Sequence, residues 1–305
     1  MLVTAERYIA QVQLLMRAIP EIDREDMFAL KGGTAINLFV RDLPRLSVDL
    51  DLVYLPVADR DSSLAAVRDG LGRIGDQLER RGLHVARQLL KDGKRLVVSE
   101  GTSAIKIEVS PVLRGTVFEP ERKAVSPAVQ ERFGFAEMQL VSPADLYAGK
   151  IAAALDRQHP RDLFDVYFLF QNGGIDDDLF RAFLIYLVSH DRPAVELLDP
   201  NRQDISLPYE HEFIGMTIDE IPLDTLLETR ERLIGEIQSR VRQEGPTRFL
   251  TSFHTLDADW QSIGFDEDIG QLPAVRWKLL NLEKLRGANP KKFDNEFARL
   301  AQFLG

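Results

Sequence analysis

The chain has 305 residues, a formal net charge of −10 and 45% hydrophobic residues, a length and composition that suit two folded domains rather than a disordered chain. It contains no cysteine, which excludes disulfides, thiolate metal sites and a nucleophilic cysteine, so any metal must be bound by oxygen or imidazole. No run approaches the roughly 20 apolar residues of a membrane-spanning helix, and the acidic start of the chain is unlike a signal peptide, so we expect a soluble, cytoplasmic protein with no membrane partner.

Helix and strand patterns alternate in the first part of the chain. Apolar residues at three- and four-residue steps predict a helix over 3–19, closed by Pro20, and another over 61–80. Between them, a tight turn over 32–34 is predicted to lead into a short helix over 35–40. Strand-type alternation is found over 47–54, 83–90, 95–99 and 104–109. Up to about residue 125 we therefore expect helices around an antiparallel or mixed sheet.

Beyond Ser142 nearly every long segment has helical spacing. The pair Ser142-Pro143 is typical of a helix start, with serine as the N-cap and proline in the first turn. Further helices are predicted over 161–170 and 223–241, and the proline-containing stretch 191–222 is predicted to be a long irregular connection. We therefore assign residues 1–130 to a mixed α+β domain and residues 131–305 to a helical domain.

Asp49 and Asp51 are the first candidates for chemistry. Residues two apart on a strand project from the same face, so both carboxylates can share a hard cation such as Mg²⁺. Taken alone, such a pair is most often a solvated strand face. Here it follows Gly32, Gly33 and Thr34, where paired glycines open the amides at a helix start and a hydroxyl lies beside them to hold a phosphate oxygen. The alternative is an ordinary helix-entry turn capped by Thr34.

Three further groups are candidates for the same chemistry. Glu108, on the strand over 104–109, is placed to complete the metal site or to deprotonate an attacking hydroxyl, and a solvated acid fits the pattern equally well. Lys150 follows Gly149 on the helix that starts after Ser142, where a lysine can meet a triphosphate or simply face solvent. Asp162 is explained by an N-terminal cap, whereas Asp165 lies a turn further in beside large apolar residues.

Other familiar sites are absent from the sequence. The five histidines, at 84, 159, 190, 211 and 254, have no metal-ligand spacing. There is no Gly-x-Ser-x-Gly elbow or Walker lysine loop. The glycines at 70, 72 and 75 have the spacing of a dinucleotide fingerprint, but they fall inside the helix predicted over 61–80 and not at a helix start after a strand. Hydrolase, P-loop and Rossmann interpretations therefore lack their key element.

In combination these motifs resemble the AbiEii/AbiGii nucleotidyltransferase family, which includes abortive-infection and MenT-type toxins. The segments that carry the resemblance are LKGGTA (30–35), RLSVDLDL (45–52), DLYAGK (145–150), RDLFD (161–165), FIGM (213–216) and LPAVRWK (272–278). The resemblance thus extends over nearly the whole chain. It implies a polymerase-β-like nucleotidyltransferase domain with a mixed sheet, joined to a helical C-terminal domain in a bi-lobed chain, with NTP and Mg²⁺ bound between the two.

The resemblance also implies a role for each candidate residue. Gly32, Gly33 and Thr34 would contact phosphate, with Lys150 and Asp162 also binding the nucleotide. Asp49 and Asp51 would bind the metal. Lys150 would neutralise the triphosphate and Asp165 would be an essential acid. The role of Glu108 as a third carboxylate is not fixed by the resemblance.

Similarity to the toxins implies NMP transfer from an NTP to an RNA 3′ end, with tRNA the expected acceptor, and a block of translation and growth. It also implies an antitoxin encoded alongside, which need not bind the toxin. Alternatives are nucleotidylation of a protein or small-molecule hydroxyl, or nucleotide binding without turnover. A C-terminal basic cluster favours an RNA acceptor, because its Trp277 can stack a base. The alternative is a C-terminal helix with a solvated basic face and Trp277 in the core. The basic residues of the cluster are Arg276, Lys278, Lys284, Arg286, Lys291 and Lys292.

Overall fold

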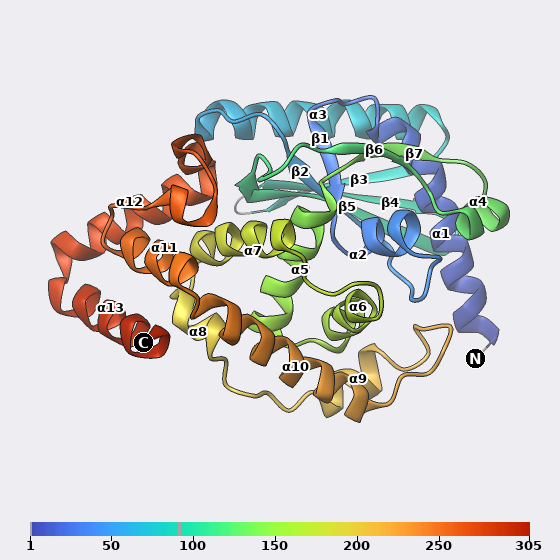
Figure 1. Cartoon of the computed structure of the whole chain (residues 1–305). Helices are drawn as coiled ribbons and strands as arrows, with labels where there is room; N and C mark the ends of the chain where they lie inside the picture. Colours follow the sequence, from blue (N-terminus) through green and yellow to red (C-terminus); the bar gives the residue numbers. More distant parts are fainter. Residues whose placement is uncertain (1, 91–92) are drawn as a thin grey trace. The chain divides into compact units, whose positions relative to one another are not determined.

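The structure, a computed structural model, describes residues 2–90 and 93–305 and forms two compact units (Figure 1). The first contains Met1–Ser142 together with Ile214–Glu220, and the second contains Pro143–Phe213 and Ile221–Gly305. The units divide later than the expected boundary after residue 130. The reason is a final strand, β7 (Glu137–Leu140), which pairs with two other strands of the first unit.

The first unit contains a seven-stranded mixed sheet in the order β3-β4-β5-β2-β1-β7-β6. The pairs β2–β5 and β1–β7 are parallel and the other neighbours are antiparallel. This confirms the mixed sheet that the sequence predicts. The remaining strands are β1 (Phe28–Lys31), β2 (Asp49–Tyr54), β3 (His84–Leu90), β4 (Gly93–Glu100), β5 (Ser103–Arg114) and β6 (Glu121–Ala124).

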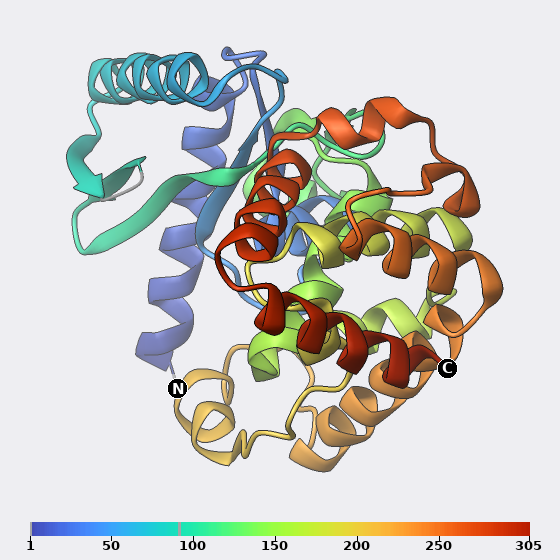
Figure 2. The same cartoon turned by 90° about the vertical axis from the view of Figure 1, so that its left-hand side faces the viewer.

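Two long helices cover one face of this sheet. They are α1 (Leu2–Ile22) and α3 (Arg60–Arg80), which contact the sheet and each other (Figures 1 and 2). Helix α1 does not end at Pro20, contrary to the expectation from its sequence. Proline removes one N–H from the last turn, but the backbone continues helically, with the amide of Asp23 donating to the carbonyl of Ile19. A third, shorter helix of the same unit is α4 (Pro127–Phe133).

A short two-part helix connects β1 to the loop before β2. Helix α2 (Gly32–Ala35) begins directly after β1 and continues as the π-helix η1 (Ile36–Val40). The short helix predicted over 35–40 therefore starts earlier and is more widely wound than an α-helix. π-Helical turns are rare and are frequent at functional sites. The glycine turn is thus the first turn of a helix whose N-terminus lies at the end of a strand.

The second unit is helical, as predicted. Residues 143–305, all of which the structure describes, form no β-strand. The stretch 191–222 is less irregular than its prolines suggest, since it contains α8 and α9. The elements are α5 (Pro143–Arg157), α6 (Pro160–Gln171), α7 (Asp177–Ser189), α8 (Ala194–Leu198), α9 (Ser206–Glu212), α10 (Leu223–Val241), α11 (Glu244–His254), η2 (Trp260–Ile263), η3 (Glu267–Gln271), α12 (Pro273–Ala288) and α13 (Pro290–Leu304). Within residues 2–90 and 93–305, no helix has the length and apolar character needed to span a bilayer.

Candidate functional site

The acidic face of β2 is the first part of the site. Leu50 and Leu52 are fully buried, while Asp49 and Asp51 are only half-buried. Because alternate residues of a strand point to opposite faces, the two carboxylates share one face and the two leucines anchor the other in the core. The aspartate pair is therefore held by a central strand of the sheet, between β5 and β1.

The glycine turn lies against this acidic face. Gly32 has a φ of +77°, a conformation that side-chain-bearing residues rarely adopt, and a Cβ built on it would lie 2.6 Å from Oδ2 of Asp51. Lys31, the residue before it, pairs with Asp51 across the two strands. Gly32 is thus required twice, once for its backbone conformation and once for the close approach of the aspartate.

Thr34 helps to hold the acidic strand in place. Its side chain is buried, and its hydroxyl donates a hydrogen bond of 2.5 Å to the carbonyl of Asp49 and lies 3.0 Å from Oγ of Ser47. The hydroxyl that the sequence suggested for a phosphate oxygen therefore already has protein partners. Ser47, which the sequence pattern does not single out, is half-buried, and a Cβ on Gly33 would lie 2.8 Å from its Oγ.

Asn37 and Arg45 also contact the glycine turn, at Gly33. Asn37 is fully buried, and its amide donates to the carbonyl of Gly33 at 2.8 Å, while its Oδ1 accepts from the backbone N–H of Arg45 at 3.3 Å. The guanidinium of Arg45 is also buried, and a Cβ on Gly33 would lie 2.6 Å from its Nη2. Sequence analysis does not single out Arg45 as a site residue, because its burial, which is unusual for an arginine, is visible only in the structure.

Glu108 lies next to the aspartate pair, but its carboxylate has a partner. Its Cα is opposite that of Asp51 in the parallel β2–β5 pairing and opposite that of Arg95 in the antiparallel β4–β5 pairing. The Arg95 Nε lies 2.6 Å from Oε1 of Glu108, and both side chains are about one-third exposed. Among the residues that the structure describes, no three histidine, aspartate or glutamate side chains come together as metal ligands.

Two carboxylates suit Mg²⁺ when a substrate completes its coordination. Magnesium is commonly held by one or two protein carboxylates together with waters and the phosphates of its substrate. Asp49 and Asp51 supply hard oxygen donors from one strand face, and the missing Cβ of Gly32 lets the Asp51 carboxylate approach the glycine turn closely. These residues therefore fit a magnesium–nucleotide complex better than a closed structural metal site.

The second unit contains a buried cluster of one lysine and two aspartates. Nζ of Lys150, on α5, lies 2.7 Å from Oδ1 of Asp162 and 3.0 Å from Oδ2 of Asp165, both on α6. The two carboxylates are 1% exposed and the lysine 8%. The sequence identified all three residues, and the structure brings them together. Lys150 is a buried cation here rather than a solvated one.

Arg157, the last residue of α5, completes this cluster. Its Nε and Nη2 donate to the two oxygens of Asp162 at 2.6 and 3.0 Å. Burial by itself would raise the pKa of Asp162, but Lys150 and Arg157 outweigh it and hold the pKa well below its usual range. Asp162 is therefore a buried carboxylate with two cationic partners. It is not the cap of α6, because the N-cap of that helix is His159.

Close packing of α5 positions Lys150. Gly149 faces α7, where a Cβ would lie 3.2 Å from the ring of Tyr186. The Tyr186 hydroxyl donates to Oδ1 of Asp145 at 3.2 Å, and burial together with that carboxylate raises the pKa of the phenol. Gly149, the residue before Lys150, therefore allows α5 and α7 to approach closely.

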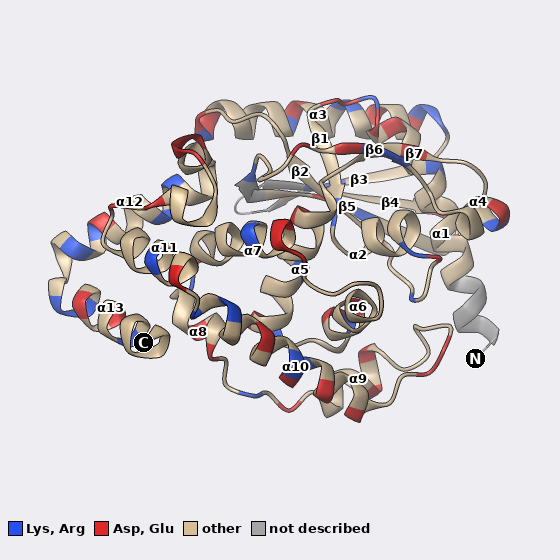
Figure 3. Cartoon of the chain, viewed as in Figure 1, with Lys and Arg blue, Asp and Glu red and all other residues tan. Residues whose placement is uncertain are grey.

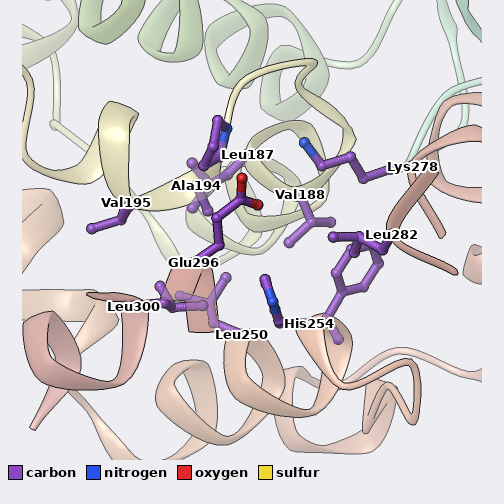
Figure 4. A pocket seen from close by; sticks show the side chains of 12 residues that line it. Leu187, Val188, Ala194, Val195, Leu250, His254, Lys278, Leu282, Glu296 and Leu300 are labelled. Atoms are coloured by element: carbon purple, nitrogen blue, oxygen red, sulfur yellow. The ribbon is translucent and has the colours of Figure 1, made fainter. Parts of the chain in front are cut away.

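The C-terminal basic cluster is only partly solvent-facing. Nζ of Lys278 donates to the carbonyls of His190 at 2.6 Å, Asp191 at 3.2 Å and Arg192 at 2.9 Å, and burial lowers its pKa. It lies beside His254 and Glu296 at a cavity of about 40 Å³ otherwise lined largely by apolar side chains (Figure 4). That volume suits a water molecule rather than a nucleotide. Lys278 is thus a structural cap for the end of α7.

Comparison with known proteins identifies the family. A family model described as "Nucleotidyl transferase AbiEii toxin, Type IV TA system" matches residues 13–280. MenT4, a nucleotidyltransferase toxin from Mycobacterium tuberculosis H37Rv, has a similar structure over 96% of this chain and 93% of its own, with a TM-score of 0.56 and 16% identity. This likeness concerns the fold alone, and it confirms the expected α+β class. No curated protein sequence matches. Because the family model covers most of the chain, the chain belongs to the AbiEii nucleotidyltransferase toxin family of type IV toxin–antitoxin systems.

Proposed function

We propose that this toxin transfers a nucleoside monophosphate from an NTP to the 3′ end of an RNA, with tRNA as the acceptor, and so blocks translation and growth. The observation that carries the proposal is the pair Asp49 and Asp51 on one strand face, with Gly32 packed against Asp51. Family membership supports nucleotidyl transfer. The choice of acceptor rests on the resemblance to MenT-type toxins.

The proposed reaction is an in-line substitution at the α-phosphorus. The oxygen of the RNA 3′-hydroxyl forms a bond to that phosphorus, the bond from it to the oxygen bridging the β-phosphate breaks, and pyrophosphate leaves. The hydroxyl proton passes to a base, and the candidate is Glu108, whose Cα is opposite that of Asp51 in the β2–β5 pairing. Mg²⁺, when bound, polarises the α-phosphate and stabilises the charge on the departing pyrophosphate.

The remaining roles are part of the same proposal, and the contacts of each residue support them. Asp49 and Asp51 hold the metal, and the N-terminus of α2 at Gly32 and Gly33 offers amides to phosphate oxygens. Thr34 acts indirectly by fixing the carbonyl of Asp49. Lys150 supplies positive charge to the triphosphate, and Asp162 and Asp165 fix its ammonium group in position.

A cognate antitoxin encoded alongside is the expected partner, as in other type IV systems. It counteracts the toxin without necessarily binding it. We further propose that the enzyme acts in the cytoplasm, where NTPs and tRNA are available.

The test is label transfer by an Asp51→Asn variant. Purified protein is incubated with each α-³²P-labelled NTP, Mg²⁺ and total tRNA, and labelled RNA and released pyrophosphate are both measured. Removing a metal-binding charge should lower transfer by at least about 1,000-fold, and growth inhibition should disappear with it. The matched control is Asp42→Asn, because Asp42 is an exposed acid in the loop between the glycine turn and β2.

The outcomes separate the alternatives. Wild-type transfer to RNA that is lost in Asp51→Asn and kept in Asp42→Asn supports the proposal. Pyrophosphate release with label on protein or on a small molecule would assign a different acceptor. Full toxicity of a folded Asp51→Asn variant would refute the mechanism.

A further inference from the structure

One face of α12 exposes an indole ring and an aliphatic side chain to solvent. Trp277 is 50% exposed and Leu280 is 48% exposed, and the two lie three residues apart on the helix, hence side by side. The other tryptophan, Trp260, is buried. Trp277 is therefore not part of the core, which was one of the two interpretations of its sequence context.

Three cations of α12 have no acidic partner among the residues that the structure describes. Arg276, Lys284 and Arg286 are exposed, and in the described part of the chain no carboxylate lies within ion-pair distance of any of them. Nζ of Lys284 lies 5.8 Å from the centre of the Trp277 ring. Many arginines elsewhere pair with acids, as do Arg87 and Arg122. In a chain with a net charge of −10, these residues make α12 locally rich in positive charge. Figure 3 marks the lysines and arginines of α12 in blue.

A groove of about 460 Å³ runs along an adjoining side of α12 and shares Leu280 with the exposed face. Helix α12 lines it with Arg276, Leu279, Leu280, Glu283 and Arg286. Leu256 and, from η3, Gly270 and Gln271 complete the lining. The groove therefore combines apolar side chains with two cations and one acid from a single helix. We call these residues, together with Trp277 and Lys284, the α12 surface.

From this arrangement we infer that the α12 surface binds a single-stranded segment of the RNA substrate. An exposed aromatic ring flanked by cations is the arrangement with which proteins hold single strands, since a base stacks on the ring while its phosphates contact lysine and arginine. An acidic protein segment would satisfy the cations but would not need the flat indole. The inference rests on the proposed function, because it assumes that the acceptor is RNA.

The experiment measures RNA binding separately from nucleotide transfer. A fluorescein-labelled RNA of single-stranded sequence and deacylated tRNA are titrated with full-length protein by fluorescence anisotropy, between about 50 and 200 mM salt. Trp277→Ala should weaken binding by about 5- to 100-fold, the effect of removing one base–aromatic stack. Replacing Arg276, Lys284 and Arg286 by alanine should reduce the slope of log Kd against log salt by about 0.7 for each phosphate that these side chains neutralise.

Matched controls keep the test specific. Phe135→Ala removes an aromatic ring that is 62% exposed on the other unit, and Arg299→Ala removes an exposed cation on α13. Neither should change Kd. Asp51→Asn should bind RNA with wild-type affinity while failing to transfer label. All the variants replace exposed or half-buried side chains, and circular dichroism verifies that each one folds.

The outcomes distinguish this inference from the proposed function. If wild-type protein labels RNA but the α12 variants bind it normally, only the α12 surface is refuted. If RNA binds through the α12 surface without being labelled, only the proposed acceptor is refuted. Displacement of RNA by polyglutamate, with Trp277→Ala binding both ligands as the wild type does, would assign the surface to an acidic protein and overturn the inference.

Discussion

Replacing Gly32 with alanine should separate the folding role of the glycine turn from its role at the acidic strand. Forcing an alanine to a φ of +77° costs about 1 to 2 kcal/mol, a loss that a protein with an ordinary unfolding free energy of about 5 to 15 kcal/mol survives. The new methyl group would also lie 2.6 Å from Oδ2 of Asp51. Ordinary van der Waals contact requires several tenths of an ångström more, so the carboxylate must move.

A displaced carboxylate at this position should affect activity far more than stability. A shift of about 1 Å in a catalytic group can lower a rate by about 100-fold, so we expect Gly32→Ala to lose nucleotide transfer by about that factor. Gly82→Ala is the control, because Gly82 has a φ of +79° and a Cβ added there would meet no atom within 4 Å. It introduces the same backbone strain with no collision.

Urea unfolding and pyrophosphate release measured on both variants test this reasoning. Both should lose a similar free energy of unfolding, while only Gly32→Ala should lose activity. Equal activity in the two variants would refute the conclusion that the close approach of Gly32 and Asp51 matters for transfer.

Two further predictions concern the other acids of the site. The folded pKa of Asp162 lies below its unfolded value, so its charge stabilises the fold at neutral pH and this contribution is lost as the pH falls below about 4. Asp162→Asn should therefore cost about 3 to 5 kcal/mol at pH 7, with the difference from wild type shrinking in urea titrations at lower pH; a constant difference would contradict this. If Glu108 is a third metal ligand, Glu108→Gln should raise the Mg²⁺ concentration for half-maximal pyrophosphate release by about 10- to 100-fold. An unchanged Mg²⁺ concentration with a lower maximal rate would instead support the role of Glu108 as the base, and no change in either would leave it only as the partner of Arg95.

Sequence patterns were most informative where one segment determines its own structure. The helix predicted over 61–80 is α3 (Arg60–Arg80), and the strand predicted over 47–54 is β2 (Asp49–Tyr54). In both, the apolar spacing alone defines a buried face. The sequence also singled out Lys150, Asp162 and Asp165, although the ion pairs that join them are seen only in the structure.

The features that the sequence did not predict depend on partners far away in the chain. Strands β6 and β7 are only four residues each, so their patterns are too short to recognise, and β7 is fixed by pairing with β1. Arg95 meets Glu108 only once β4 and β5 are in register. The hydrogen bonds of Lys278 likewise form only when the end of α7 lies beside α12. Neither segment's own sequence predicts that the two are neighbours.

The segment Ile214–Glu220 has a consequence for any attempt to study half of this toxin. It follows helix α9 of the second unit, yet it belongs to the first unit, where the amide of Leu46 donates to the carbonyl of Met216 and the amide of Ile218 to that of Pro44. Thr217 also bridges Arg45. A fragment ending at Ser142 would leave the loop before β2 without these backbone partners. A single cut in the chain therefore cannot release an intact first unit. A gene truncated before this segment would encode a protein in which the loop that precedes Asp49 and Asp51 lacks these backbone hydrogen bonds.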